Sequence, residues 1–278
     1  MALLLAGCGT RGRAAKPDRP RLTPNVAMRD VTFYSAALRR DMQYRVVLPK
    51  ALVSGEKLPV LYLLHGRGEG FRDWSNDSDV ARFAERRMIL VMPEGRGSYY
   101  TNSAAHPQDR YEDYIVDDLV RDVESKFPAA RDRAQRAIAG VSMGGFGAVK
   151  LALKHPRLFG FAAGLSPALD VPSRPFSIQR ALTWREHRAI FGPWDSAWSR
   201  ANDPYVLARS ADPAETPFLY LSCGDQEGLL PANRKFAALL AARGFQYEFH
   251  AAAGGHNWNQ WNRELPHMFE SLLQHMGR

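Results

Sequence analysis

The chain has 278 residues, of which 45% are hydrophobic and 24% are charged. This composition supplies a core for one large folded domain and excludes a disordered or fibrous protein. No run approaches the roughly 18 apolar residues of a membrane-spanning helix, and two cysteines exclude a disulfide framework or a cysteine-rich zinc site. The net charge of +8 forms no basic stripe outside the N-terminus, so we expect no nucleic-acid partner.

The first 28 residues differ in composition from the rest. Leu5-Ala6-Gly7-Cys8 has the form of a bacterial lipobox, in which small residues precede a cysteine that receives a lipid. We therefore expect 1–8 to be part of a lipoprotein signal that starts upstream, and Cys8 to anchor a periplasmic or other extracytoplasmic protein to a membrane. The alternative is a short apolar N-terminus with an unmodified cysteine. Residues 9–28 are rich in Arg, Gly and Pro, which predicts a flexible basic tether.

From residue 29 to residue 278 the pattern is that of one domain in which strands alternate with helices. Apolar residues at every second position over 31–48 predict two strands, joined as a hairpin. Further strands are expected at 58–64, 88–92, 136–140, 159–165, 217–222 and 246–250. Helices are expected at 79–87, 111–127, from the turn after 140 to 155, 233–243 and 257–276. This alternation predicts an α/β fold with a mostly parallel sheet and helices on both faces.

Residues 172–206 interrupt that alternation. The segment holds several large aromatic side chains, among them Trp184, Phe191, Trp194 and Trp198. We interpret it as an inserted segment near the active site, with Trp184 and Trp194 beside the substrate pocket. The alternative is that these rings only seal the edge of the core.

A Gly-x-Ser-x-Gly motif places one serine between a predicted strand and a predicted helix. The motif runs from Gly140 to Gly144, with Ser142 at its centre. This strand–turn–helix context is the one that a nucleophile elbow requires. The start of the helix would aim amide donors at negative charge that develops on a substrate. Ser142 is therefore the candidate nucleophile.

A serine nucleophile needs a histidine base and an acid that orients the base. His256 lies in a Gly-Gly-His loop between the last strand and the last helix, where a base can reach the serine. Two acids, Asp225 and Glu227, follow the strand that ends near Gly224. From the residues alone both stay open.

Two other features are considered as candidate functional sites: the glycine-rich loop after His65 and Cys223. The loop that begins His65-Gly66 follows an early strand, so its backbone amides, with that of Met143, could form an oxyanion hole. The glycines after His65 have the wrong spacing for a dinucleotide-binding loop. Cys223 ends an apolar strand and reads as a buried small hydrophobe. We expect no metal and no cofactor.

Several of these segments together resemble one family. From about residue 31 to the C-terminus the chain resembles the esterase D-like putative esterases of the α/β-hydrolase superfamily. These include acetyl, tributyrin and feruloyl esterases, S-formylglutathione hydrolases and antigen 85 mycolyltransferases. The resemblance rests on residues 61–66, 111–115, 139–145, 202–204, 223–224, 233–234, 254–258 and Trp261.

The resemblance implies an α/β-hydrolase fold and a cofactor-free serine carboxylesterase that acts on small acyl esters, including acylated polysaccharides. It gives Ser142 the role of nucleophile and His256 that of base, and it assigns the oxyanion amides to Arg67 and Met143. In such hydrolases the acid usually stands three residues after the strand's final glycine, which favours Glu227 over Asp225. Trp258 and Trp261 would pack behind His256, and either could also wall the acyl pocket.

Two other functions would use the same fold. An acyltransferase would have the same catalytic residues but pass the acyl group to an acceptor alcohol instead of water. A non-catalytic binding protein would have no reason to keep a serine, a histidine and an acid in this order. We therefore favour the esterase, with a small ester as partner and the membrane reached only through the lipid anchor; the oligomeric state stays open.

Overall fold

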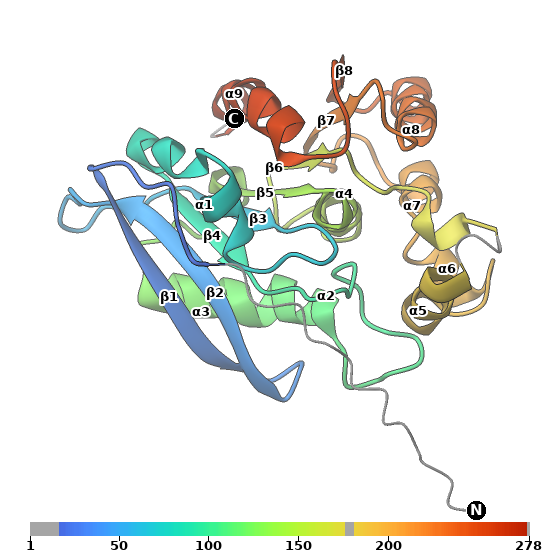
Figure 1. Ribbon diagram of the computed structural model, residues 1–278, viewed down its shortest axis with the longest axis horizontal. Coiled ribbons are helices and arrows are strands. Elements are labelled where there is room, and N and C mark those ends of the chain that lie inside the picture. Colours follow the sequence, from blue (N-terminus) through green and yellow to red (C-terminus); the bar gives the residue numbers. More distant parts are fainter. Residues whose placement is uncertain (1–16, 176–180, 277–278) are drawn as a thin grey trace, which may run out of the picture.

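The computed structural model describes residues 17–175 and 181–276 (Figure 1). Within these residues eight strands form one sheet in the order β1-β2-β4-β3-β5-β6-β7-β8. The β1–β2 and β2–β4 pairs are antiparallel and the others are parallel, which confirms the predicted, mostly parallel sheet. The strands are β1 (Val26–Ser35), β2 (Arg40–Pro49), β3 (Val60–Leu64), β4 (Ile89–Pro93), β5 (Arg136–Val141), β6 (Phe161–Leu165), β7 (Phe218–Gly224) and β8 (Tyr247–Ala252).

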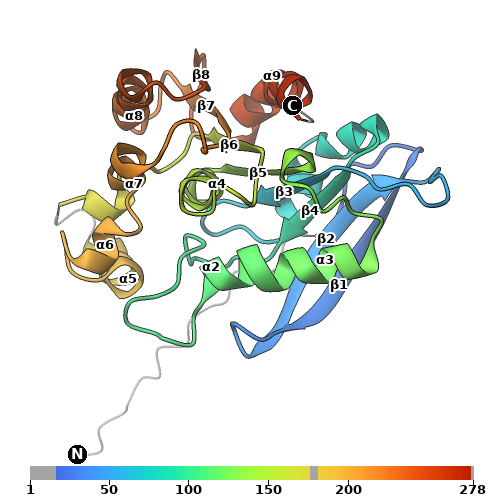
Figure 2. The same cartoon turned by 180° about the vertical axis from the view of Figure 1, so that it is seen from behind.

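Helices cover both faces of the sheet, as Figures 1 and 2 show from opposite sides. Successive side chains of a strand point to opposite faces. Tyr62 and Leu64 of β3 join a core with α3, α4 and α8, whereas Leu61 and Leu63 join a second core with α1 and α9. The α-helices are α1 (Asp73–Asp77), α2 (Tyr111–Asp113), α3 (Val120–Lys126), α4 (Met143–Lys154), α5 (Ala181–Phe191), α6 (Ala197–Arg200), α7 (Pro204–Ser210), α8 (Leu230–Arg243) and α9 (Trp258–His275).

Three of the expected helices differ in detail. The segment expected at 79–87 is a 3₁₀ helix, η1 (Val80–Arg86). The one expected at 111–127 contains a π-helical stretch, η2 (Tyr114–Leu119), between α2 and α3. Helix α8 starts three residues earlier than expected, because Pro231 fits the first turn of a helix, where no amide donor is needed. Two short 3₁₀ helices complete the described elements: η3 (Arg133–Gln135) and η4 (Val171–Ser173).

The structure differs from the predicted tether over residues 17–28. Strand β1 begins at Val26, and Asp18 is held by Arg45, whose side chain is fully buried. The Nη2 of Arg45 lies 2.7 Å from Asp18 Oδ2, and its Nε lies 2.6 Å from Asp30 Oδ1. A buried guanidinium needs such charged partners, so Asp18 is fixed against the sheet. Residues 1–16, with the predicted lipidation site Cys8, lie outside the described residues.

The segment predicted as an insertion, 172–206, runs from within η4 to the first residues of α7, between β6 and β7. Its helices α5 and α6 lie beside α7 at one side of the molecule (Figures 1 and 2). Among residues 17–175 and 181–276, no helix has the length and apolar character needed to cross a membrane.

Candidate active site

Ser142 lies at a sharp turn between β5 and α4. Its backbone has φ 54° and ψ −112°, a conformation that costs a residue with a side chain about 1–3 kcal/mol. The turn is tight because α4 starts directly against the sheet: a Cβ on Gly144 would lie 2.1 Å from the Leu64 carbonyl oxygen. A Cβ on Gly140 would lie 2.2 Å from the Gly144 carbonyl carbon. Only glycines allow this packing, which raises the serine above the edge of the sheet.

Three loops at the carboxyl edge of the sheet bring a serine, a histidine and an acid into line. The Ser142 hydroxyl lies 2.9 Å from His256 Nε2, and His256 Nδ1 lies 2.6 Å from Glu227 Oε2. The serine follows β5, the acid follows β7, and the histidine precedes α9. In this arrangement the imidazole can accept the hydroxyl proton while Glu227 stabilises the resulting positive charge.

Glu227 is buried and held at both carboxylate oxygens. Its Oε1 accepts hydrogen bonds from the Ser166 hydroxyl (2.6 Å) and the Gly224 amide (2.8 Å). Burial alone would raise the pKa of Glu227, but the hydrogen bonds from His256, Ser166 and Gly224 outweigh it and lower the pKa. The carboxylate is therefore ionised at neutral pH.

One further side chain, Trp261, supports both this acid and its histidine. The Trp261 indole N–H donates to the Ser166 hydroxyl oxygen over 3.0 Å. The Trp261 ring also meets the His256 ring edge to face, with 5.1 Å between centroids. Trp261 thus contacts the base directly and reaches the acid through Ser166.

The other candidate acid lies elsewhere. Asp225 is exposed, and its Oδ1 accepts a hydrogen bond from the Gly254 amide over 3.0 Å. It therefore braces the loop that carries His256, whereas the Glu227 carboxylate contacts the imidazole itself.

The loop after β3 approaches the serine from the other side. A Cβ on Gly66 would lie 3.6 Å from the Ser142 Cβ. The Gly66 amide already donates to Glu69 Oε2 over 2.8 Å. The next amide, that of Arg67, is therefore the one that this loop can offer to a substrate oxygen beside Ser142. Met143 supplies a second donor, because the first amides of a helix have no acceptor within the helix.

The direction of the Arg67 amide is set by its neighbours. The Gly95 amide donates to His65 Nε2 over 2.8 Å, which assigns the ring proton to Nδ1. That Nδ1–H donates to the Gly66 carbonyl oxygen, also over 2.8 Å. Because the peptide group is planar and trans, fixing the Gly66 carbonyl points the Arg67 N–H the opposite way.

A tryptophan and an acid support the same loop. The Trp258 indole N–H donates to Glu69 Oε1 over 2.8 Å, while Glu69 Oε2 holds the Gly66 amide. Burial raises the pKa of Glu69. The sequence predicts Trp258 as a pocket residue. In the structure it supports the loop after β3, because it holds the Glu69 carboxylate that binds the Gly66 amide.

The predicted pocket tryptophans of the insertion do come together. Trp184 and Trp194 line one cavity with His187 and Phe191, against the segment that follows β6. Neither Ser142 nor Trp258 is part of its lining. Tyr99 connects the two regions: its ring packs edge to face on Phe191 and on Phe146, which lies one turn after Ser142.

Cys223 is buried, and burial raises the pKa of its thiol to about 12, so the thiolate is scarce. Residues 17–175 and 181–276 contain no group of three or more His, Cys, Asp or Glu side chains that could hold a metal ion.

The sequence reasoning missed Ser166, Glu69 and the supporting role of His65. All three follow the carboxyl ends of parallel strands. Because ligands and functional groups gather at that edge of an α/β sheet, the first polar residue after a predicted strand was the available signal for His65 and Ser166, but not for Glu69. For Ser166 that signal is the serine that directly follows the strand expected at 159–165.

The sheet with helices on both faces, and the aligned serine, histidine and acid at its carboxyl edge, define the class as an α/β-hydrolase. Residues 35–272 match the family model described as "Putative esterase". The chain belongs to this esterase family.

Named relatives agree with that assignment. The chain is 26% identical over 260 residues to an acetyl esterase of Caldicellulosiruptor saccharolyticus, covering 88% of this chain and 97% of the relative. A solved ferulic acid esterase superposes with a TM-score of 0.78 at 26% identity, covering 91% and 99%. FphF, a fluorophosphonate-binding serine hydrolase of Staphylococcus aureus, gives 0.76 at 25%, covering 89% and 98%. These matches support a carboxylic ester hydrolase.

The support of Glu227 gives a first prediction. Ser166→Ala removes one hydrogen bond to the carboxylate and the acceptor of the Trp261 indole. We expect kcat to fall about tenfold to a hundredfold with KM little changed, because the acid and base lose their fixed orientation. Steady-state kinetics on 4-nitrophenyl acetate measure both values.

Ser222→Ala is the matched control for that prediction. Ser222 is also a buried serine at this edge, but its hydroxyl has no hydrogen-bond partner among the described residues. The control should keep wild-type kcat. Equal kcat values for both variants would contradict the role given to Ser166.

Proposed function

We propose that this protein is a serine carboxylesterase that cleaves small acyl esters through an acyl-enzyme on Ser142. One observation carries the proposal: the hydrogen-bonded line from the Ser142 hydroxyl through His256 to the buried Glu227. A serine hydroxyl is a weak nucleophile on its own, and this line supplies both a base and the acid that orients it.

In the first half of the reaction, His256 Nε2 takes the proton from Ser142 as its oxygen attacks the ester carbonyl carbon. The carbonyl oxygen becomes an oxyanion, and the amides of Arg67 and Met143 donate to it. His256 then gives the proton to the alkoxide oxygen of the leaving alcohol. The acyl group stays on Ser142 as an ester.

In the second half, water replaces the alcohol. His256 accepts a proton from this water as the water attacks the acyl-enzyme, and the same two amides stabilise the second oxyanion. The proton returns to Ser142 as the carboxylic acid leaves. The His256 side chain is 40% exposed, so water has access to the base.

The acetyl esterase supports an acetyl group and the ferulic acid esterase supports a hydroxycinnamoyl group. A butyryl group stays a prediction from the sequence resemblance. An acylated polysaccharide is the larger substrate that we propose. The extracytoplasmic location and the lipid on Cys8 stay predictions from the sequence.

The choice of acid is tested by two isosteric substitutions, with Ser142→Ala as the reference for lost catalysis. Ser142→Ala should lower kcat by about 10⁴ to 10⁶ while the fold is kept. Glu227→Gln should lower kcat by about 10³ to 10⁴, because the amide cannot stabilise the imidazolium. Asp225→Asn should stay near wild type. The measurement is kcat on 4-nitrophenyl acetate with and without added alcohol.

Three results would overturn parts of this proposal. More than a tenth of wild-type activity in Ser142→Ala would remove the nucleophile. A large loss in Asp225→Asn alone would move the acid to that residue. Dominant formation of the new ester in the presence of alcohol would make the protein an acyltransferase.

The cavity of the insertion is expected to set the preference for acyl chain length. Trp184→Ala enlarges this cavity, whose wall residue Phe191 packs on Tyr99, which in turn packs on Phe146 one turn after Ser142. Longer acyl chains should therefore gain relative to acetate. A series of 4-nitrophenyl esters from acetate to octanoate measures kcat/KM. Trp198→Ala is the control: Trp198 belongs to the insertion but not to the cavity lining. An unchanged profile in Trp184→Ala would mean that the rings only seal the core.

A further inference from the structure

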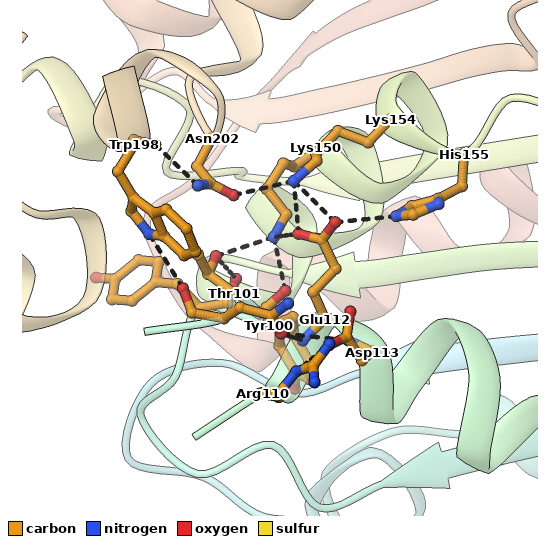
Figure 3. Close-up of polar contacts among 12 residues, drawn as sticks. Tyr100, Thr101, Arg110, Glu112, Asp113, Lys150, Lys154, His155, Trp198 and Asn202 are labelled. Atoms are coloured by element: carbon orange, nitrogen blue, oxygen red, sulfur yellow. Dashed lines mark hydrogen bonds and ion pairs between the residues drawn. The ribbon is translucent and has the colours of Figure 1, made fainter. Parts of the chain in front are cut away.

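A lysine is buried beneath the active site, on the helix that Ser142 precedes. Lys150 of α4 has no exposed side-chain surface, and its ammonium group donates three hydrogen bonds (Figure 3). The acceptors are the Tyr100 carbonyl oxygen at 2.7 Å, the Thr101 hydroxyl at 3.0 Å and Glu112 Oε2 at 2.8 Å. Three donors with three acceptors leave no proton of the ammonium group unpaired.

The partner carboxylate is equally well compensated. Glu112 is buried and also accepts from Lys154, at 2.8 Å, and from His155 Nε2, at 3.0 Å (Figure 3). Burial alone would raise the pKa of Glu112, but the charges of Lys150 and Lys154 and the His155 hydrogen bond hold it well below its ordinary value. Lys150 and Glu112 are thus a buried ion pair, and loss of one partner leaves a costly unpaired charge.

Lys150 holds a strained part of the loop that follows β4. Tyr99 and Tyr100 are consecutive residues with φ of 53° and 51°, a region that favours glycine. Such a conformation persists only where surrounding contacts enforce it. A Cβ on Gly147 of α4 would lie 2.6 Å from the Tyr100 ring, so the ring packs directly on the helix that carries Lys150.

The same loop sets the oxyanion side of the site. The Tyr100 hydroxyl donates to the His65 carbonyl oxygen over 3.0 Å, and the Gly95 amide donates to His65 Nε2 over 2.8 Å. His65 in turn fixes the Gly66 carbonyl, and with it the direction of the Arg67 amide. A continuous set of contacts therefore runs from Lys150 through Tyr100 and His65 to Arg67.

We propose that Lys150, paired with Glu112, is a positioning residue for the oxyanion hole. It holds the Tyr99–Tyr100 turn in its strained form, and the Tyr100 hydroxyl passes that constraint to the loop that carries the Arg67 amide. This rests on the proposed function, because it assumes an oxyanion beside Ser142. An ion pair that served stability alone would leave the chemistry of the folded enzyme unchanged.

Two substitutions test the contact at its two ends. Tyr100→Phe removes only the hydroxyl that holds His65, and Lys150→Met removes the ammonium group that holds the turn. We expect each to lower kcat about tenfold to a hundredfold, below the 10²- to 10³-fold cost of losing an oxyanion donor outright, with KM within about threefold. Because both substitutions act on one constraint, the fold-loss of kcat in the double variant should be much smaller than the product of the two single fold-losses.

A second measurement reports on the oxyanion hole itself. A trifluoromethyl ketone adds to the serine and forms a tetrahedral oxyanion, so its inhibition constant should weaken by about the same factor as kcat/KM. Affinity for the carboxylate product should change far less.

Matched controls separate positioning from stability. Tyr44→Phe removes a buried tyrosine hydroxyl that bonds Asp122, and Arg136→Met breaks a buried ion pair with Glu124 at the amino end of β5. Both should lower the melting temperature and keep kcat and ketone inhibition. If Lys150→Met does not fold, Tyr100→Phe still tests the contact between Tyr100 and His65, on which the proposed role of Lys150 depends.

The outcomes are distinguishable. Wild-type kcat and ketone inhibition in folded Tyr100→Phe would overturn the positioning role, and so would additive losses in the double variant. Retained activity in Ser142→Ala would instead overturn the proposed function. A loss of melting temperature alone would make Lys150 and Glu112 a structural pair.

Discussion

The close approach of α4 to the sheet is the constraint on which the rest of the site depends. Gly140 and Gly144 leave no room for a Cβ, so the helix begins directly against the end of β3. This contact forces Ser142 into a strained conformation and brings its side chain beside the Gly66 loop. It also gives the site the unpaired first amides of α4. The position of Ser142 and the unpaired amides at the start of α4 are thus two results of one packing contact.

Polar contacts around this turn hold the partners in place. A buried carboxylate is stable only when its oxygens accept hydrogen bonds. Glu227 meets this condition through Gly224, Ser166 and His256, and these contacts also leave one oxygen aimed at the imidazole. Asp225, two residues earlier, is exposed and has no such need, and it accepts a hydrogen bond from the Gly254 amide of the loop that carries His256.

The loop after β3, beside Ser142, is also held by hydrogen bonds on several sides. The Arg67 amide is oriented indirectly, because every group around it is fixed: the Gly66 amide by Glu69 and the Gly66 carbonyl by His65. His65 is held by the loop after β4, and that loop rests on α4 at Tyr100 and Lys150. Helix α4 therefore contacts both sides of the site, at its start through Ser142 and two turns later through Lys150.

The sequence by itself determined the sheet, the elbow serine and the histidine loop, because strand periodicity and glycine spacing are local properties of the chain. The local sequence could not decide whether Asp225 or Glu227 is the acid that holds His256, because both follow the same strand. Only the path of the loop determines which carboxylate is buried. Ser166, Glu69 and Lys150 carry no motif, and each has partners far away along the chain: 61 residues for Ser166, 189 for Glu69 and 38 to 50 for Lys150. The tertiary structure alone decided these contacts, because hydrogen bonds between distant segments depend on how the loops at one edge of the sheet pack together.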